Sequence, residues 1–412
     1  MDRAANDVWV SLPLPRAEPE AVGMSSVRLA RLGDRLREDI DKGRMPGAMV
    51  AIARRGHIVH FEAYGYRDRE ADVPMTEDTI FNIASMTKPV TAVTALTLYE
   101  EGRLLIDEPL GHYLPAFRDM RVARLDETKA AILGTEPAAR PITIQDLMLH
   151  TCGIVYGGRG TTAVHKQLVA SSAGLVPMSR DEVIARLSGV PMLHQPGAVW
   201  DYGFGLDLLG LVIETITGQP LGKAMDERVF APLGMQDTAF HIPADKARLY
   251  ARALPRDPET GAAQTAGIDL TKAPVTQSGG GGLGSTAADY LRFALMLLGK
   301  GLPGETRVMG RKTAEYMLSD HLGPQTQNLI RNADPTRAGY GFGLGLAVRN
   351  RVGHLRMAGS VGEFSWPGAS GTNWWADPRE ELVVVFMAHT PGTIRWHYRE
   401  LVAALVNQAI VD

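Results

Sequence analysis

The chain has 412 residues, of which 45% are hydrophobic and 22% charged, so it is long and apolar enough to form a globular protein with a sizeable core. The formal net charge of −3 gives no indication of a nucleic-acid or anionic-membrane partner, and the single cysteine, Cys152, excludes an internal disulfide bond. There is no apolar run of about 18 residues and none of signal-peptide length after Met1. We therefore expect a soluble cytoplasmic protein with no membrane partner.

The N-terminal part predicts an irregular arm over residues 1–24, followed by a helix and a β-hairpin. Ser25 or Ser26 can cap a helix that continues to about residue 42, because leucine and isoleucine recur there at helical spacing. Residues 48–53 and 58–66 are each typical of a strand, and a turn lies between them.

The remainder predicts a helical middle and a strand-rich end. Further helices are expected near residues 85–101, 144–149, 181–190, 204–217, 286–298, 312–318 and 393–410. Strands are expected at 340–348, 354–359, 371–376 and 382–389, and their short connections indicate antiparallel pairing. Residues 157–180 are rich in glycine and serine and predict a flexible flap. Together with the polar loop 319–338, this flap is expected to shape the mouth of a pocket.

Ser85 precedes Lys88 by three residues at the predicted start of a helix, and residues three apart share a helix face. A serine hydroxyl becomes a good nucleophile only when another group takes its proton. A lysine can do so if burial or nearby positive charge lowers its pKa. The helix N-terminus also offers free N–H groups to a developing oxyanion. The pattern favours nucleophilic catalysis, although Ser-x-x-Lys also arises by chance.

Two other segments carry candidate chemistry. Tyr202 lies between a Pro-Gly turn and an apolar helix, where a neighbouring lysine could let it act as a general base; the alternative is a tyrosine that only packs its ring. In residues 364–372, small side chains would let the backbone approach a substrate, and an exposed N–H could form an oxyanion hole with that of Ser85. The alternative is a glycine-rich bend with Trp366 in the core.

Several other patterns are not interpreted as sites. The glycines at 279–284 match dinucleotide-binding spacing by density alone and follow no predicted strand, so they indicate a loop. There is no Gly-x-Ser-x-Gly sequence, which argues against a nucleophile elbow. A thiol nucleophile at Cys152, beside His150, is disfavoured because close neighbours in sequence seldom face each other. No ligand spacing resembles a zinc site, so we expect no metal and no cofactor.

In this order, the Ser-x-x-Lys motif, the tyrosine and the glycine-containing segment resemble the serine β-lactamase and penicillin-binding-protein superfamily. The similarity extends from about residue 18 to the end and is closest to the class C β-lactamase-like branch, which includes family VIII carboxylesterases and related acyltransferases. The sequence segments that support this similarity are residues 81–88, 143–153 and 339–345. The resemblance implies an α+β, β-lactamase-like fold. An antiparallel sheet (1–105 and 279–412) would be flanked by N- and C-terminal helices, with a mainly helical domain (106–278) inserted.

The resemblance also implies roles by position. Ser85 would be the acylated nucleophile, Lys88 would accept or relay its proton, and Tyr202 would act as base and then protonate the leaving alcohol. The N–H groups of Ser85 and Ala369 would form the oxyanion hole. The substrate pocket would include Trp366, Gly368, Phe204 and Gln145.

Two departures from the lactamase motifs bear on the substrate. The Tyr-x-Asn motif is Tyr202-Gly203-Phe204 here, and Trp366 replaces the lysine of Lys-Thr-Gly. Both changes remove polar groups, so we expect an apolar pocket that favours neutral esters over charged lactams and peptides.

The predicted function is therefore a carboxylesterase that acts on a small-molecule ester through an acyl-enzyme. An acyltransferase, a β-lactamase and an amide hydrolase remain alternatives on the same site. A non-enzymatic scaffold gains little support, because the serine, lysine and tyrosine are all present. The oligomeric state does not follow from the sequence.

Overall fold

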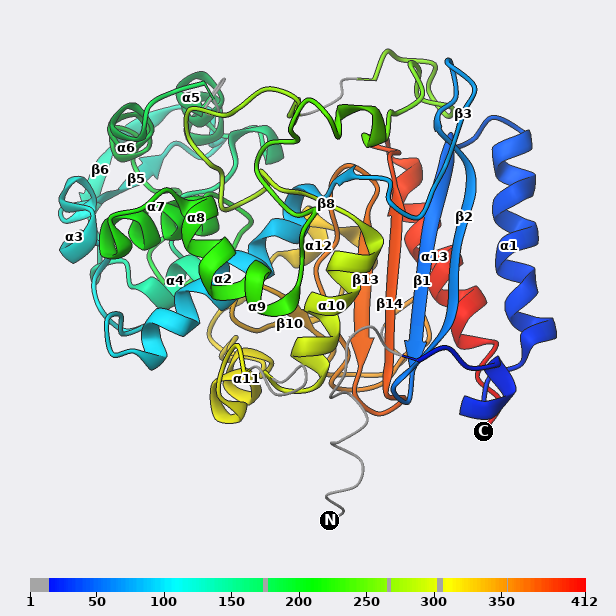
Figure 1. The fold of residues 1–412 in the computed structure, drawn as a ribbon. Coiled ribbons are helices and arrows are strands. Elements are labelled where there is room, and N and C mark those ends of the chain that lie inside the picture. Colours follow the sequence, from blue (N-terminus) through cyan, green and yellow to red (C-terminus); the bar gives the residue numbers. More distant parts are fainter. Residues whose placement is uncertain (1–14, 173–176, 265–267, 302–306, 354) are drawn as a thin grey trace.

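An eight-stranded antiparallel sheet lies at the centre of the computed structural model, which describes residues 15–172, 177–264, 268–301, 307–353 and 355–412 (Figure 1). The strand order is β10-β11-β12-β13-β14-β1-β2-β3, and every neighbouring pair is antiparallel. The antiparallel pairing predicted for the C-terminal strands from their short connections is confirmed. The strands are β1 (Gly47–Arg54), β2 (His57–Asp68), β3 (Val73–Pro74), β10 (Gly341–Phe342), β11 (Ala347–Val348), β12 (Phe364–Ser365), β13 (Asn373–Asp377) and β14 (Leu382–Ala388).

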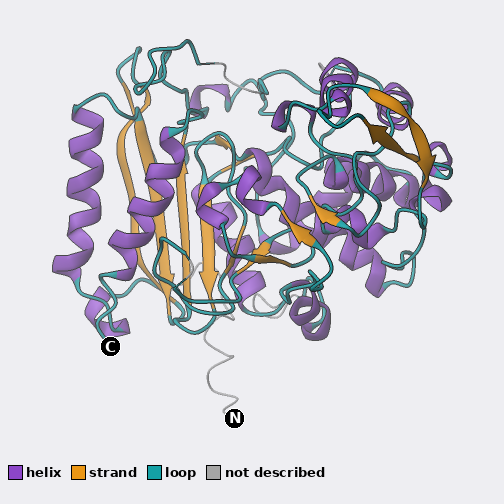
Figure 2. Ribbon diagram, turned by 180° about the vertical axis from the view of Figure 1, so that it is seen from behind, coloured by secondary structure: helices purple, strands orange, loops and turns teal. Residues whose placement is uncertain are grey.

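The two central strands, β1 and β14, are buried on both faces. Val50 and Ile52 of β1 point into one core, whereas Met49 and Ala51 point into the other. Successive side chains of a strand alternate between faces, so a strand covered on both sides needs the nearly continuous apolar run seen here. Helices α1 (Ser26–Asp41) and α13 (Ile394–Asn407) cover one face (Figure 2), and α10 (Ala287–Leu298) packs on the other.

Helix α1 follows its sequence pattern closely. Ser25 is the N-cap and accepts a hydrogen bond from the N–H of Arg28. The apolar residues at helical spacing, Leu29, Leu32, Leu36 and Ile40, are all buried. The predicted helix to about residue 42 is confirmed.

Helix α2 (Thr87–Glu100) runs through the interior of the molecule, and its residues from Thr87 to Leu98 are all buried. A helix that is apolar on all sides is expected in such a place. Pro89 lies in the first turn, where the missing N–H leaves no helical hydrogen bond unmade.

The remaining elements gather mostly beside the sheet (Figure 1). The helices are α3 (Leu110–Tyr113), α4 (Ile144–Met148), α5 (Ala163–Ser172), α6 (Arg180–Ser188), α7 (Gly205–Thr217), α8 (Leu221–Met225), α9 (Ala231–Leu233), α11 (Arg311–Met317) and α12 (Ile330–Ala333). The short strands pair as β4 (Phe81–Asn82) with β8 (Gly284–Ser285), β5 (Arg121–Leu125) with β6 (Ile132–Pro137), and β7 (Val199–Trp200) with β9 (Gln327–Asn328). The division at residues 105 and 279 stays a prediction.

Three expectations need correction. The segment 355–359 has no strand, and residue 354 lies outside the described residues. The expected strand at 340–348 is two strands, β10 and β11, because Gly345, with a φ of 86°, takes part in a turn between them. The expected flap contains helix α5, whose Val164 and Leu168 are buried; its residues 173–176 lie outside the described residues. Residues 1–14 of the expected arm also lie outside them.

The hairpin β5–β6 was missed in a region that predicted mainly helices. Its strands are largely exposed, so few of their side chains show the apolar alternation that marks a half-buried strand.

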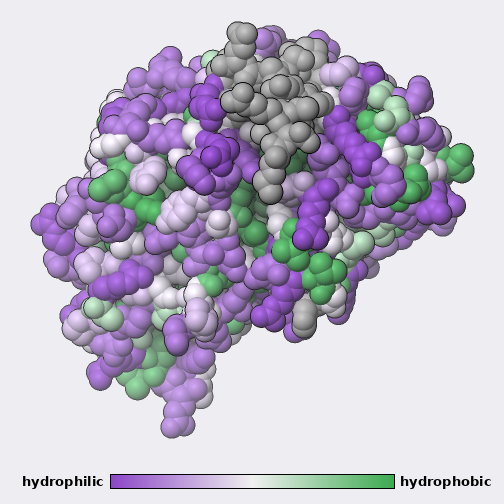
Figure 3. All heavy atoms as spheres, turned by 90° about the horizontal axis from the view of Figure 1, so that it is seen from below, coloured by the Kyte–Doolittle hydropathy of each residue, from purple (hydrophilic) through white to green (hydrophobic). Residues whose placement is uncertain are grey.

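Hydrophilic side chains cover most of the face seen in Figure 3, with hydrophobic residues in small separate patches. The most exposed large apolar side chains of the described residues, such as Val27, Leu133 and Val275, come from different elements. Single residues of this kind are usual on protein surfaces. Among the described helices, none combines the length and the apolar character that crossing a membrane requires.

Candidate active site

Ser85 lies in a short 3₁₀ turn, Ala84–Met86, directly before α2. Ala84 has a φ of 43°, in the left-handed region that residues other than glycine rarely adopt. Its N–H donates to Asn82 Oδ1 (2.9 Å), and Tyr290 Oη donates to the carbonyl of Met86 (2.8 Å). Hydrogen bonds on both sides of Ser85 thus hold the turn that presents its hydroxyl.

Lys88 is fully buried, and its side chain reaches Ser85, as the three-residue spacing predicted. Its Nζ donates to Ser85 Oγ (3.3 Å), to Tyr156 Oη (3.2 Å) and to the carbonyl of Gly280. These three acceptors match the three donors of an ammonium group. The Lys88 Nζ also lies 4.6 Å from the centre of the Tyr202 ring.

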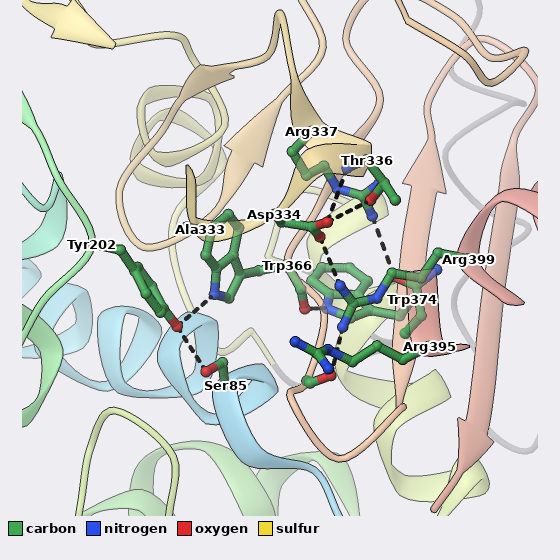
Figure 4. A network of polar contacts seen from close by, with 12 residues as sticks. Ser85, Tyr202, Ala333, Asp334, Thr336, Arg337, Trp366, Trp374, Arg395 and Arg399 are labelled. Carbon is green, nitrogen blue, oxygen red and sulfur yellow. Dashed lines mark hydrogen bonds and ion pairs between the residues drawn. The ribbon is translucent and has the colours of Figure 1, made fainter. Parts of the chain in front are cut away.

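Tyr202 reaches the same serine from the other side. Strand β7 leads into it, and its hydroxyl donates to Ser85 Oγ at 2.7 Å. The indole Nε1 of Trp366 donates to the Tyr202 oxygen at 3.2 Å (Figure 4). A hydrogen-bond donor stabilises negative charge on the oxygen that accepts from it. The structure therefore brings together Ser85, Lys88, Tyr202 and Trp366 from three distant parts of the sequence.

Tyr156 and Asp207 also belong to this network, although no sequence pattern identified them. Tyr156 accepts from Lys88 and donates to Asp207 Oδ2 at 2.7 Å. Burial, and then the Asp207 carboxylate, raise the pKa of Tyr156 well above its usual value, so the phenol keeps its proton. Asp207 Oδ1 accepts from Ser278 Oγ and from the N–H of Gly280. The glycine run forms the expected loop. The loop lies against Lys88, and its Gly280 carbonyl accepts a hydrogen bond from Nζ.

Among the described residues, no hydrogen bond joins the side chain of His150 or Cys152 to Ser85, Lys88 or Tyr202. The ring of His150 lies 4.7 Å from that of Tyr202 and is buried. Burial, with a contribution from Lys88, lowers the pKa of His150 well below its usual value, so its ring is neutral. Burial raises the pKa of Cys152 to about 12, and a buried thiol of this kind is inert.

The two residues expected to form the oxyanion hole, Ser85 and Ala369, both line one small cavity. Gly368 brings the second segment close, because a Cβ there would lie 2.5 Å from the carbonyl oxygen of Ile83. The geometry suits two donors to one oxyanion, a role that stays a prediction.

The cavity has a volume of about 20 Å³, room for about one water molecule. Tyr202 and Trp366 line it with Ser85 and Ala369. Arg159 from the expected flap lines the cavity, as do Ala333 and Asp334 from residues 319–338, so both segments contribute to its wall. The expectation that 319–338 is a loop needs correction, because this segment contains β9 and α12. Arg395 and Arg399 of α13 complete it. The expectation of an apolar pocket is wrong, because three arginines lie in its wall.

Three residues expected in the pocket lie elsewhere. Phe204 packs its ring against Tyr156, with centroids 4.5 Å apart. Gln145 contacts His321 (Nε2 to Nδ1, 3.4 Å). Gly368 acts through its backbone, which donates to the Thr372 carbonyl and accepts from Arg399. None of the three lines the cavity beside Ser85.

Within the described ranges, no group of three or more His, Cys, Asp or Glu side chains is placed to hold a metal ion. The polar groups around Ser85 suit proton transfer to and from a nucleophilic hydroxyl.

Residues 32–407 match the family model described as Beta-lactamase. The chain belongs to the β-lactamase family. The fold predicted from the motifs is thereby confirmed, and with it the superfamily to which they pointed.

Relatives within the β-lactamase family carry different activities. The chain is 37% identical to Protein Rv1367c of Mycobacterium tuberculosis (86% of this chain, 89% of the relative). It is 31% identical to Esterase EstB of Burkholderia gladioli (90% and 93%). Its fold is similar to that of EstCE1, a hydrolase with promiscuous acyltransferase activity, with a TM-score of 0.72, 24% identity and coverage of 94% and 99%. These relatives support a serine hydrolase-type enzyme.

Proposed function

We propose that this protein is a carboxylesterase that forms an acyl-enzyme on Ser85. The observation that carries the proposal is the contact of one serine oxygen with two groups that can manage its proton: Ser85 Oγ lies 2.7 Å from Tyr202 Oη and 3.3 Å from Lys88 Nζ. A nucleophile within hydrogen-bond distance of a base is the arrangement that covalent catalysis needs.

In acylation, Tyr202 in its phenolate form takes the Ser85 proton as Oγ attacks the ester carbonyl carbon. The carbonyl oxygen becomes an oxyanion and receives hydrogen bonds from the N–H groups of Ser85 and Ala369. The bond from the acyl carbon to the alcohol oxygen then breaks, and Tyr202 returns the proton to that oxygen. The products of this step are the free alcohol and an ester of Ser85.

In deacylation, water attacks the acyl carbon and gives a proton to the Tyr202 oxygen, which passes it back to Ser85 as the carboxylic acid leaves. Trp366 donates to this oxygen, and Lys88 Nζ lies over the Tyr202 ring while it donates to Ser85 Oγ. If an alcohol takes the place of water, the same steps make a new ester. EstCE1, described as having promiscuous acyltransferase activity, gives that alternative its support.

The test is hydrolysis of p-nitrophenyl esters from acetate to laurate, in parallel with a chromogenic cephalosporin. Ester turnover that disappears in Ser85→Ala supports the proposal. Ser365→Ala is the matched control, because Ser365 is buried and its Oγ makes no hydrogen bond. Dominant cephalosporin turnover would point to a β-lactamase, and faster formation of new ester than of free acid with added alcohols would point to an acyltransferase. An active Ser85→Ala variant that still labels with a fluorophosphonate would place the nucleophile elsewhere.

A further inference from the structure

The wall of the Ser85 cavity is unevenly charged. Its lining residues include three arginines, Arg159, Arg395 and Arg399, but a single carboxylate residue, Asp334. Figure 4 shows Asp334 with Arg395 and Arg399. An uneven balance in a catalytic cavity favours a ligand of the opposite sign.

Arg399 is already neutralised. Its Nη1 lies 2.9 Å from Asp334 Oδ2, and its Nη2 donates to the Gly368 carbonyl at 2.6 Å. Both side chains of this ion pair are 3% exposed. Arg399 therefore holds the Gly368–Ala369 segment in place and has its counterion beside it.

Arg159 and Arg395 have no counterion among the described residues. The Arg159 Nη1 donates to the Ala333 carbonyl at 3.0 Å. The Arg395 Nη1 donates to the carbonyls of Pro391 and Gly392, each at 2.7 Å. A guanidinium has five N–H donors, so each of these two arginines keeps donors for a further acceptor. In Figure 4 the guanidinium end of Arg395 points from α13 toward Ser85.

The positive charges of these two arginines also interact. Burial, and then the positive charge of Arg159, lower the pKa of Arg395, and Asp334 opposes this only in part. Like charges in one partly buried cavity repel, and an anion between them would remove that repulsion. A carboxylate suits the planar fork of arginine better than a spherical ion does.

Arg159 also lies next to the proposed base, Tyr202. Its guanidinium carbon lies 5.6 Å from the centre of the Tyr202 ring. In the proposed reaction Tyr202 protonates the leaving alcohol, so the alcohol part of the ester lies on this side. Arg159 is exposed, so a ligand can reach its guanidinium group from solvent.

We propose that Arg159 and Arg395 bind a carboxylate carried by the leaving-alcohol part of the substrate, so that the preferred substrates are esters of hydroxy acids. The inference rests on the proposed function. It also assigns selectivity to two residues that lie outside the proton-transfer network.

The experiment compares meta-acetoxybenzoate with meta-acetoxybenzamide, which have the same acyl group and similar shape but differ in charge. Wild-type kcat/KM should be higher for the carboxylate. Arg159→Gln and Arg395→Gln should each lower that value roughly ten- to hundredfold for the carboxylate and leave it nearly unchanged for the amide. Turnover of the amide shows that each variant is folded. The control is Arg331→Gln, which removes the same charge from an exposed position of α12 outside the cavity wall.

A second pair of substrates places the carboxylate on the acyl part: p-nitrophenyl hydrogen succinate and its methyl ester. A loss with meta-acetoxybenzoate alone supports the proposal. A loss with the succinate alone overturns it, because the anion would then bind on the acyl side. Equal rates for charged and neutral esters in wild type and variants also overturn it, while the carboxylesterase remains. No turnover of any ester, with no fluorophosphonate labelling of Ser85, would instead remove the proposed function itself.

Discussion

The indole Nε1 of Trp366 donates to the Tyr202 hydroxyl oxygen at 3.2 Å, and that hydroxyl in turn lies 2.7 Å from the Ser85 oxygen. The sequence motifs predict that Trp366 takes the place of the lactamase lysine, and its indole is a neutral donor to the tyrosine. Its hydrogen bond strengthens when the oxygen is a phenolate, because a bond to an ionised acceptor is stronger than one to a neutral acceptor.

We predict that Trp366→Phe lowers kcat about tenfold, because it keeps an aromatic ring but removes the donor to Tyr202. Trp200→Phe is the control: Trp200 lies in the same aromatic cluster, 6.1 Å from Trp366 between centroids, and its buried Nε1 makes no hydrogen bond. Steady-state kinetics on a neutral p-nitrophenyl ester measure the difference. Equal losses in the two variants would show that packing matters and the indole N–H does not.

Tyr202→Phe removes the group that exchanges the proton with Ser85. We expect kcat to fall about 10²–10⁴-fold, the usual range for loss of a general base, with little change in melting temperature. Tyr398→Phe removes a buried hydroxyl that has no hydrogen-bond partner and should leave turnover near the wild-type value. Substantial activity in Tyr202→Phe would exclude this tyrosine as the base.

Tyr156→Phe should lower kcat about tenfold with a smaller effect on KM. The change removes the acceptor for one Lys88 N–H and leaves Asp207 without that donor, so Nζ is held less well. Tyr156 acts through Lys88, so its loss should also change the pH profile of kcat. The measurement is kcat and KM across pH. A pure change in melting temperature with normal kinetics would limit Tyr156 to a structural role.

The buried ion pair between Asp334 and Arg399 predicts a loss of stability in Asp334→Asn. Removing one partner of such a pair leaves a buried charge and costs about 3–5 kcal/mol. Burial acts to raise the pKa of Asp334, but Arg399, Arg337 and the hydrogen bonds from Thr336 outweigh it, so the folded-state pKa lies below the usual value.

The sign of the pH dependence follows from that lowered pKa. The Asp334 carboxylate contributes its stability above the unfolded-state pKa of about 3.9, and the contribution is lost as pH falls through the folded-state pKa. In urea unfolding, the gap between wild type and Asp334→Asn should therefore be constant near neutral pH and narrow in acid. Asp34→Asn, which breaks an exposed ion pair with Arg37, should change the midpoint little. A gap that widened in acid would contradict the sign.

Local patterns were sufficient to predict much of the fold and the central site residues. The capped helix after Ser25, the buried strand β1 and the spacing of Ser85 and Lys88 are all encoded by neighbouring residues. The prediction of a strand at 354–359 was wrong, because a few apolar residues there resemble a strand. In the structure, the strand that pairs with β12 on that side is β11.

The positive charge of the cavity was missed for a different reason. Arg159 follows a glycine-rich turn and Arg395 opens the last helix, and nothing in either local sequence shows that both face Ser85. Tyr156 was missed in the same way. Such residues meet only after the sheet and the helical region have packed, and a single sequence does not contain that information in its local spacing.

The pairing of β1 with β14 sets the order of events during synthesis. On the ribosome, β1 emerges with two apolar faces and can pair with β2 at once, but its other neighbour, β14, follows much later in the sequence. The nascent chain must therefore carry Ser85 and a central strand with one open edge until β14 has been made, which favours slow folding and exposure to aggregation or chaperones. A chain that stops before residue 366 would contain the nucleophile but neither Trp366 nor Ala369. The complete set of site residues is therefore present only when the last strands of the sheet are being made.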